Sequence, residues 1–480
     1  MKSADSLDLN TQTRVILWQK LSNLIEEYIT GVSQTRVAPE LDVQKIRSFI
    51  QSVSFDNPIN PLDALDFVYR ALWRYQVHTP HPRYFGLFNP ASTTMSIVAD
   101  TLVATFNPQL AAWSHSPFAA EVERNLVQTL GTQFGYKTND VDGTFTTGGA
   151  EANFTAILTS LTHKFPEFNS NGINGLNTQP ILYVSSESHH SLVRAARMSG
   201  IGSNAVRSVP VDESLKMDLD FLVKLIKKDV NAGQTPFLVV GTAGTTNAGV
   251  IDPISAIAEV AAQYNLWFHV DAAWGGAAVF LPELRFVLQG IEYADSITFD
   301  THKWLSVSMS AGLFLTRHKT ILEDTFKIKT DYMPKDAKGL PVIDPYSHSV
   351  QWSRRFIGLK VFMSLAVAGW EGYINAIRNQ VSMGNLLRRE LEKTSWQVVN
   401  KTELPVVCFM DNSVSTENHD KFIKTMGDKI ISSGKAWIST TYLNSKLPVL
   451  RACITNYRTD TEDVLALVNI LEETRLNLQQ

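Results

Sequence analysis

The chain has 480 residues, of which 44% are hydrophobic and 10% aromatic, which is enough for a large core and more than one domain. Its 43 Lys and Arg residues nearly balance its 47 Asp and Glu residues, and they are spread evenly. This balance gives no long basic surface for a nucleic acid or a membrane, so the expected partner is a small molecule.

The chain contains two cysteines, Cys408 and Cys453, which both lie in apolar runs. Such residues are expected to be reduced and buried rather than part of a disulfide framework. The N-terminus lacks the basic and apolar order of a secretion signal, and no run reaches the roughly 18 apolar residues of a membrane span. We therefore expect a cytoplasmic protein.

Residues 1–90 are expected to form an N-terminal helical segment. Apolar side chains recur at helical spacing from Thr11 to Gly31, which predicts an amphipathic helix that needs a partner surface. The stretch 81–90 is rich in aromatic residues but too interrupted by proline for a long helix or a central strand. It is expected to be an ordered loop, either as a packing cover or as a wall of a substrate pocket.

Residues 91–369 are expected to form a large α/β domain. From Gly143 onward, short apolar runs alternate with helical segments, which predicts a mostly parallel sheet. The predicted strands are Ile181–Val184, Phe237–Val240, Trp267–Val270, Ser296–Phe299 and Gly312–Leu315.

Residues 370–480 are expected to form a smaller α+β domain, because a long helix is followed by short apolar runs and a closing helix. The predicted strands there are Gln397–Val399, Pro405–Phe409, Ala436–Ile438 and Leu450–Ile454. The polar segment 327–351 is too long for a tight connection and is a candidate functional loop.

A glycine-rich turn at Gly148, Gly149 and Ala150 leads into a segment with the apolar spacing of a helix. The free N–H groups and the positive dipole end of such a helix can bind a phosphate, although a plain turn remains the alternative. The turn matches neither the P-loop nor the dinucleotide-binding pattern. A single phosphate monoester fits it better.

Lys303 follows the predicted strand Ser296–Phe299, so it lies at the edge of the sheet where ligands bind in open α/β folds. A lysine in such apolar surroundings can lose its proton and form a Schiff base with an aldehyde cofactor. Taken alone, Lys303 is more simply interpreted as a solvated surface lysine. The residues upstream reverse that preference.

His189 and Asp271 also follow predicted strands. The imidazole of His189 can lie against a planar cofactor, and Asp271 can keep a ring nitrogen protonated while the ring cation offsets the burial of the carboxylate. The neighbouring His190 does not complete a metal site, because adjacent side chains diverge and no further metal-binding residues accompany the pair. The phosphate turn, His189, Asp271 and Lys303 together supply one contact for each part of pyridoxal phosphate.

The segments TTGGAEAN, SESHHSL, GTAGTTNAG, HVDAAWGG, DTHKW and WSRRFIGLK resemble, in this order, the group II pyridoxal-phosphate decarboxylases. That family includes enzymes for aromatic amino acids, glutamate and 2,4-diaminobutyrate, and the resemblance covers roughly residues 75 to 370. It implies the type I fold of pyridoxal-phosphate enzymes, with a large and a small domain. It also implies a homodimer with shared active sites and an intertwined N-terminal segment.

The resemblance also implies roles for single residues. Lys303 resembles the Schiff-base lysine, Asp271 the pyridinium partner and His189 the stacking histidine. Tyr332 falls where the family carries its catalytic tyrosine, and His302 resembles the residue beside the lysine. The expected cofactor contacts are Gly148, Gly149, Ala150, His189, Thr246, Asp271, Ala273, His302 and Lys303.

The expected reaction is decarboxylation of an L-amino acid to its amine and CO2. An aromatic substrate is favoured, since the stretches that resemble the pocket walls of the family contain Tyr84, Phe85, Gln109, Ala111 and Trp113. Glutamate or 2,4-diaminobutyrate remains an alternative, as does transamination or aldehyde formation.

Two questions about charge stay open at this level. An acidic substrate would need an arginine, and Arg83 and Arg354 are available. Asp300 is expected near the phosphate, where a second anion is unfavourable unless a water or a cation intervenes.

Overall fold

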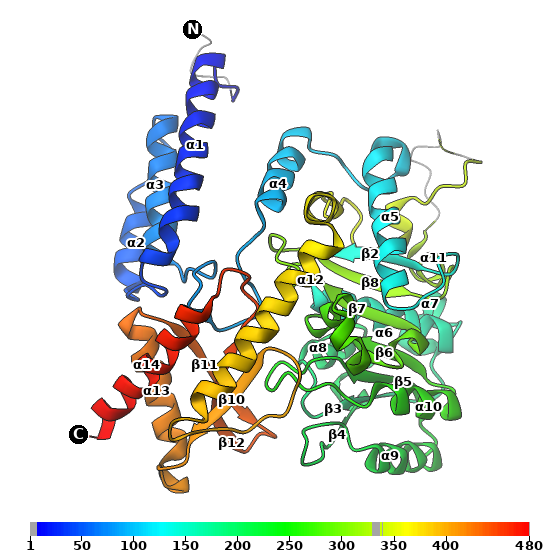
Figure 1. Cartoon of the computed structure of the whole chain (residues 1–480). Helices are drawn as coiled ribbons and strands as arrows, with labels where there is room; N and C mark the ends of the chain where they lie inside the picture. Colours follow the sequence, from blue (N-terminus) through cyan, green and yellow to red (C-terminus); the bar gives the residue numbers. More distant parts are fainter. Residues whose placement is uncertain (1–6, 329–336, 338, 480) are drawn as a thin grey trace.

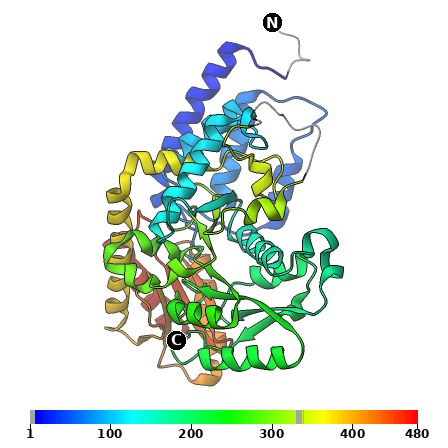
Figure 2. The same cartoon turned by 90° about the vertical axis from the view of Figure 1, so that its right-hand side faces the viewer.

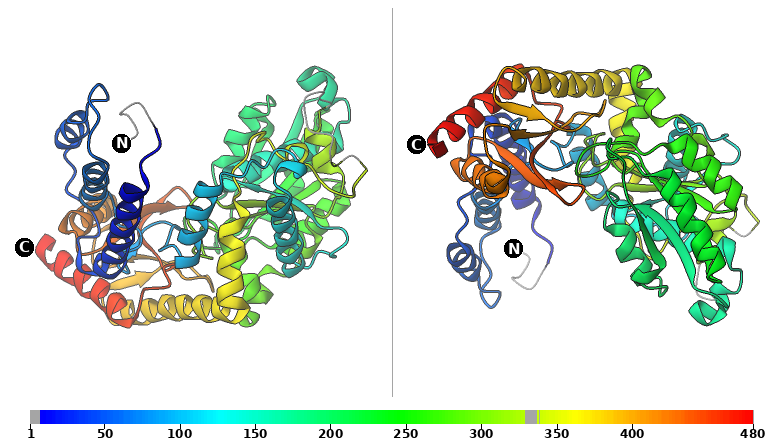
Figure 3. Two further views of the ribbon diagram at one scale, coloured as in Figure 1. Left: turned by 90° about the horizontal axis from the view of Figure 1, so that it is seen from above. Right: turned by 90° about the horizontal axis from the view of Figure 1, so that it is seen from below.

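The computed structural model describes residues 7–328, 337 and 339–479. Two β-sheets form the centres of two neighbouring bodies, and the first three helices rise from the smaller body (Figure 1). Figure 3 shows from above and below that these helices lie at the end of the molecule away from the large sheet.

The α-helices of the described part follow the chain from end to end. They are α1 (Thr11–Gly31), α2 (Val43–Gln51), α3 (Pro61–Tyr75), α4 (Thr94–Phe106), α5 (Pro117–Gln133), α6 (Gly149–Lys164), α7 (Phe168–Asn171), α8 (Ser191–Met198), α9 (Leu219–Asn231), α10 (Ile254–Tyr264), α11 (Ile321–Phe326), α12 (Gly358–Leu391), α13 (His419–Ser433) and α14 (Thr461–Gln479).

The large sheet has seven strands in the order β2-β8-β7-β6-β5-β3-β4. Strand β8 is antiparallel to both of its neighbours, and the remaining pairs are parallel. The expected α/β fold with a mostly parallel sheet is therefore confirmed. The strands are β2 (Asp142–Thr146), β3 (Pro180–Ser185), β4 (Val206–Val209), β5 (Thr235–Thr242), β6 (Trp267–Asp271), β7 (Ser296–Asp300) and β8 (Gly312–Thr316).

The five predicted strands of this sheet lie within β3, β5, β6, β7 and β8. They were recognisable because helices pack around the sheet (Figure 2), so that its central strands are continuous apolar runs. The outer strands β2 and β4 were not predicted, since Asp142–Thr146 and Val206–Val209 contain polar residues that interrupt the pattern.

The small sheet has the order β1-β11-β12-β10-β9, with β1 parallel to β11. Its edge strand β1 comes from the aromatic stretch near the N-terminus, and Phe85 is fully buried in the core of the small body. The strands are β1 (Tyr84–Phe85), β9 (Trp396–Val398), β10 (Val406–Asp411), β11 (Trp437–Leu443) and β12 (Leu447–Cys453). All four predicted C-terminal runs belong to β9–β12, with ends shifted by a few residues.

Helix α12 runs from the large body to the small one and is kinked at Gly369 (φ 62°, ψ 177°). That backbone conformation favours glycine, because a Cβ atom strains the left-handed region. The kink coincides with the expected boundary at residue 369. The division into three parts stays a prediction, since residues 84–85 of the first part complete the sheet of the last.

Helix α1 spans the predicted residues and begins at an Asn10 side chain that accepts the Thr13 N–H. It packs on α3, where the Tyr28 and Trp73 rings lie 5.2 Å apart. Its outer face leaves Val15, Ile16 and Trp18 exposed. Within the described ranges 7–328 and 339–479, no helix has the length and apolarity that a membrane crossing requires.

Candidate active site

One cavity at the carboxyl ends of the large-sheet strands gathers most of the predicted site residues. Its lining includes Gly149, Ala150, His189, Thr246, Asp271, Ala273 and Lys303. Gly148 and His302 are the chain neighbours of the lining residues Gly149 and Lys303, and they face each other: a Cβ atom on Gly148 would be 3.5 Å from Cε1 of His302. Tyr332 lies outside the described residues.

The glycine-rich turn forms one wall of the cavity. Helix α6 begins at Gly149, and Gly148 in the N-cap position has no side chain to cap the first N–H groups. A Cβ atom on Gly149 would come within 2.9 Å of Asp300 and 3.3 Å of Ala273, so a larger residue would close this wall. The uncapped N–H groups and the helix dipole make the turn suitable for a phosphate.

Lys303 follows β7 and forms an ion pair with Asp300, the last residue of that strand. Its Nζ lies 2.9 Å from Oδ2 of Asp300, whose side chain is only 2% exposed. Oδ1 of Asp300 is buried and has no hydrogen-bond partner among the described residues. Asp300 is the second anion that the sequence placed near the phosphate, and the cation beside it is Lys303.

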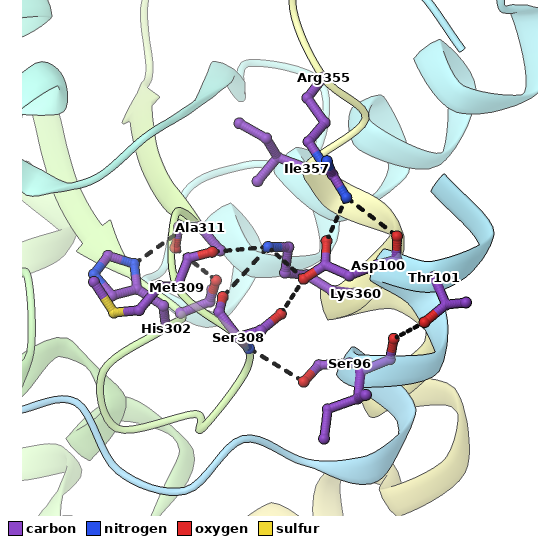
Figure 4. A network of polar contacts seen from close by, with 12 residues as sticks. Ser96, Asp100, Thr101, His302, Ser308, Met309, Ala311, Arg355, Ile357 and Lys360 are labelled. Atoms are coloured by element: carbon purple, nitrogen blue, oxygen red, sulfur yellow. Dashed lines mark hydrogen bonds and ion pairs between the residues drawn. The ribbon is translucent and has the colours of Figure 1, made fainter. Parts of the chain in front are cut away.

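The loop after Lys303 is fixed from behind by a buried lysine of α12 (Figure 4). Nζ of Lys360 lies 3.1 Å from Oδ2 of Asp100 on α4 and donates to the carbonyl oxygen of Met309 at 2.9 Å. Ser308 donates its hydroxyl hydrogen to the same Asp100 carboxylate. His302 accepts the N–H of Ala311 at its Nδ1 (3.2 Å). These contacts hold the loop that carries His302 and Lys303 against α4 and α12.

Asp271 ends β6 and is 5% exposed. Its Oδ2 accepts a hydrogen bond from Nδ2 of Asn153 at 2.8 Å, and its Oδ1 accepts the N–H of Ala273 at 3.2 Å. Both oxygens of the carboxylate thus accept hydrogen bonds from neutral donors.

His189 lies between β3 and α8. Its Nδ1 accepts the backbone N–H of Ser191 at 3.2 Å and lies 2.8 Å from the Ser191 hydroxyl. Burial lowers the pKa of His189 from its ordinary value, although the nearby Asp271 acts in the opposite direction. The ring is therefore neutral at neutral pH. Among the described residues, no group of three or more His, Cys, Asp and Glu side chains could hold a metal ion.

Four buried polar residues at the cavity were not predicted: Asn153 and Ser191, which line it, and His269 and Thr298, which lie behind Asn153. The carboxamide oxygen of Asn153 accepts from Thr298 at 2.8 Å and lies 3.1 Å from Nε2 of His269. All four stand inside motifs or strands that the sequence already identified. The available signal was a polar residue in an otherwise apolar strand or helix face, which must find a partner when buried.

The loop after β5 is held by the small body. Arg451 of β12 donates to the carbonyl oxygen of Thr246 at 2.6 Å, and Thr441 of β11 donates to Oδ1 of Asn247 at 2.8 Å. The order Asp252-Pro253 before α10 predicts an N-cap followed by a proline at the first helical position, but Asp252 instead accepts the backbone N–H groups of Met217 and Thr242. That expectation was wrong because the N-cap position belongs to Pro253.

The residues expected to line a substrate pocket do not line the cavity around Lys303 in this chain. Tyr84 contacts Trp437 in the small body, with ring centroids 5.3 Å apart, and Trp113 donates its indole N–H to Glu121. Phe88 of the same aromatic stretch stacks on Trp274, which does line the cavity. The aromatic stretch therefore supports the site from behind.

Both candidate arginines are engaged in ion pairs. Arg83 pairs with Asp463 at 3.0 Å, and the buried Arg354 pairs with Glu123 at 2.6 Å. Neither guanidinium lines the cavity around Lys303.

The family model described as the pyridoxal-dependent decarboxylase conserved domain matches residues 49–411. The chain belongs to this decarboxylase family. It is a pyridoxal-phosphate-dependent amino-acid decarboxylase, as the sequence motifs predicted.

The similarity covers between 70% and 97% of the chain for two of its relatives. The chain is 28% identical to an aromatic-L-amino-acid decarboxylase of Bacillus atrophaeus, covering 97% of this chain and 96% of the relative. It is 31% identical to an acidic amino acid decarboxylase of Bos taurus, covering 70% of this chain and 64% of the relative. The crystal structure of Oryza sativa TDC with PLP and tryptamine superposes with a TM-score of 0.93 at 23% identity, covering 99% of this chain and 100% of that chain. The type I fold of this decarboxylase is thereby confirmed.

The residues of the cavity fit the cofactor of the family. The uncapped start of α6 suits the phosphate, and Lys303 in the same cavity would provide the amine for the aldehyde. Asp271 would offer a carboxylate to the ring nitrogen, and His189 would offer a neutral ring face.

Proposed function

We propose that this decarboxylase acts on an aromatic L-amino acid, with Lys303 holding the cofactor, Asp271 facing its ring nitrogen and His189 lying on its ring. The observation that supports these roles is the single cavity that gathers Gly149, Ala150, His189, Asp271 and Lys303. Thr246, Ala273, Gly148 and His302 complete the proposed cofactor contacts.

When bound, pyridoxal phosphate supplies an electron sink for the electron pair left at the α-carbon after CO2 departs. Asp271, with both oxygens facing donors, keeps the charge that attracts a proton to the ring nitrogen. The small residues Gly149 and Ala273 in the cavity wall leave room for a flat ring. The network behind His302 keeps Lys303 in a fixed position.

Tyr332 is proposed as the group that returns a proton to the α-carbon. Its hydroxyl is a suitable acid for that step, and its place in the sequence resembles that of the catalytic tyrosine of the family. Protonation at this carbon gives the amine, whereas its failure after the loss of CO2 favours an aldehyde.

An aromatic side chain is the substrate that the chain supports best. An acidic substrate requires a positioned cation, and both arginines considered for that task are paired with carboxylates of the same chain. The cavity is bordered by Trp274, which is backed by Phe88. The relative from Bos taurus, named as an acidic amino acid decarboxylase, keeps glutamate-like and other acidic substrates as the second candidate.

The deciding experiment is a measurement of CO2 release from the twenty amino acids, DOPA and 2,4-diaminobutyrate, with product analysis by mass spectrometry. We expect the highest kcat/KM for an aromatic amino acid and the amine as product. A higher value for glutamate, aspartate or diaminobutyrate would contradict the aromatic preference. A keto acid or an aldehyde as main product would instead contradict the outcome at the α-carbon.

A homodimer is also proposed. Helices α1 and α3 expose Trp18, Val68 and Leu72, and α4 exposes Phe106, and groups of exposed apolar side chains are typical of interaction surfaces. A second copy can bury these faces, in keeping with the intertwined N-terminal segment expected from the family. Light scattering at micromolar concentration should give twice the mass of the chain. A cytoplasmic location, for which the two free and buried cysteines are suited, stays a prediction.

A further inference from the structure

Asn153 contacts more of the proposed active-site machinery than any role derived so far explains. It lies in the first turns of α6, just after the glycine-rich turn, and is 1% exposed. Its side-chain nitrogen Nδ2 donates hydrogen bonds to Oδ2 of Asp271 at 2.8 Å and to Oγ of Ser191 at 2.9 Å. Its oxygen faces Thr298 and His269.

The direction of every hydrogen bond in this network is fixed by its end groups. The Asp271 carboxylate can only accept, so Asn153 turns its nitrogen to it and leaves its carboxamide oxygen facing Nε2 of His269 at 3.1 Å. That oxygen can only accept, so Nε2 of His269 carries a hydrogen and donates it. Burial lowers the pKa of His269 to about 4, so the ring is neutral and its Nδ1 accepts from the Ser296 hydroxyl, which accepts in turn from the Trp267 indole.

The same reasoning fixes the other arm. A backbone N–H can only donate, so Nδ1 of His189 must be free of hydrogen to accept from Ser191 N. The Ser191 hydroxyl then also donates to Nδ1, and its oxygen accepts from Nδ2 of Asn153. The carboxamide of Asn153 therefore donates one hydrogen bond directly to the Asp271 carboxylate. Its other hydrogen bond, to Ser191, orients the hydroxyl that donates to Nδ1 of His189.

We propose that Asn153 is a positioning residue that sets the protonation of the active site, by donating one hydrogen to Asp271 and the other to Ser191. The first hydrogen bond gives the Asp271 carboxylate a neutral donor, so a proton shared with the cofactor has its place on the ring nitrogen and not on the carboxylate. The second directs the Ser191 hydroxyl to His189 and keeps its ring neutral. Because Asn153 shares a helix with the phosphate turn, it also fixes Asp271 relative to that turn. This inference rests on the proposed pairing of Asp271 with the ring nitrogen.

The test uses holoenzyme loaded with pyridoxal phosphate that carries ¹⁵N in its ring. The ¹⁵N chemical shift reports directly whether the ring nitrogen is protonated, and it is measured from pH 6 to 9. The variants are Asn153→Leu, which keeps the approximate volume and removes both donors, and Asp271→Asn. The matched control is Tyr183→Phe, which removes a buried hydrogen bond to the carboxylate of Asp229 in the same sheet but away from the cavity.

We expect a protonated ring nitrogen in the wild type and in Tyr183→Phe. In Asn153→Leu the resonance should move toward the unprotonated value, and kcat should fall on the order of ten- to a hundredfold, which corresponds to one hydrogen bond to a charged group. A wild-type resonance in loaded Asn153→Leu would overturn the inference. If Asp271→Asn also keeps the wild-type resonance, the pairing of Asp271 with the ring fails as well; if only Asp271→Asn moves it, the role of Asn153 alone fails.

Ser191→Ala tests the second arm with a smaller disturbance, should Asn153→Leu not fold. The protonation of His189 is followed by long-range ¹H–¹⁵N NMR of histidine-labelled holoenzyme, with His189→Gln to assign the signal. We expect hydrogen on Nε2 only in the wild type, and proton uptake at a higher pH in Ser191→Ala, because the neutral ring has lost a donor. Hydrogen on Nδ1 at pH 7 in the wild type, or an unchanged midpoint in Ser191→Ala, would overturn this arm.

Discussion

Lys303 lies within reach of Asp300, and this contact holds its side chain in the cavity. A surface lysine would extend into water, whereas this ammonium is paired at 2.9 Å with a carboxylate that is 2% exposed. The pair places the amine in the same cavity as the phosphate turn and Asp271.

Lys303→Ala should abolish covalent attachment of the cofactor. Borohydride treatment of the wild-type holoenzyme should fix the cofactor to this residue, and peptide mass spectrometry should locate the adduct there. Lys360→Ala is a useful comparison, since that lysine is also buried but lies behind the loop. An adduct on another lysine of the wild type would refute the assignment.

Tyr332→Phe should separate the loss of CO2 from formation of the amine. The substitution removes only a hydroxyl group, so packing is preserved while the proposed proton donor is lost. We expect CO2 release with a reduced yield of amine and a rise in aldehyde or other oxidised products, measured by chromatography of the reaction mixture. Unchanged rate and amine yield would transfer the proton-donor role to His302 or water.

At the level of elements, the loop between β7 and β8 depends on a lysine that belongs to a distant helix. Ser306 and Ser310 of this loop have positive φ angles of 56° and 64°, which non-glycine residues rarely adopt. Such strain persists only where surrounding contacts stabilise it. The buried ammonium of Lys360 supplies those contacts through Asp100 and Met309 (Figure 4).

Lys360→Met should release this loop. Removing one partner of a buried ion pair destabilises a protein by about 3–5 kcal/mol, and about 2–3 kcal/mol is expected here because Asp100 is partly exposed. The urea midpoint should fall, and the affinity for pyridoxal phosphate should weaken, since Lys303 is on the same loop. Lys435→Met, which breaks an exposed pair with Glu473, should change neither quantity. Cofactor affinity equal to the wild type would show that the loop keeps its shape without Lys360.

At the level of the whole molecule, the buried His269 makes the free energy of unfolding depend on pH. Burial lowers the pKa of His269 from 6.5 to about 4, so the folded chain binds fewer protons than the unfolded chain between these values. The contribution of neutral His269 to the free energy of unfolding is therefore complete above pH 6.5, and it is lost as the pH falls toward 4.

His269→Gln should weaken this acid sensitivity. For the wild type, His269 alone should reduce the free energy of unfolding by about 2 kcal/mol between pH 7 and pH 5. The measurement is the difference in urea midpoint between these two pH values for both proteins at equal concentration. The variant starts from lower stability, because its network is incomplete, but its midpoint should change less with pH. An equal change in both proteins would assign the acid sensitivity to other groups, such as His81.

The sequence by itself determined the fold class, the cofactor and the residues at the strand ends. This was possible because the parallel strands of the sheet are continuous apolar runs, and the chemical groups follow each run within a few positions: His189 after β3, Asp271 at the end of β6 and Lys303 after β7. Local patterns are sufficient wherever an element and its functional side chain are neighbours in the chain.

Only the tertiary structure decided which distant residues complete the site. Asn153 and Asp271 are 118 positions apart, and Arg354 and Arg83 turned out to pair with Glu123 and Asp463 rather than to face the cavity. Strand β1 was likewise hidden, because two residues gain their regular structure only from the parallel partner β11. Hydrogen bonds and ion pairs form between whichever groups the fold brings within about 3 Å, and the spacing of residues along the chain does not encode that distance.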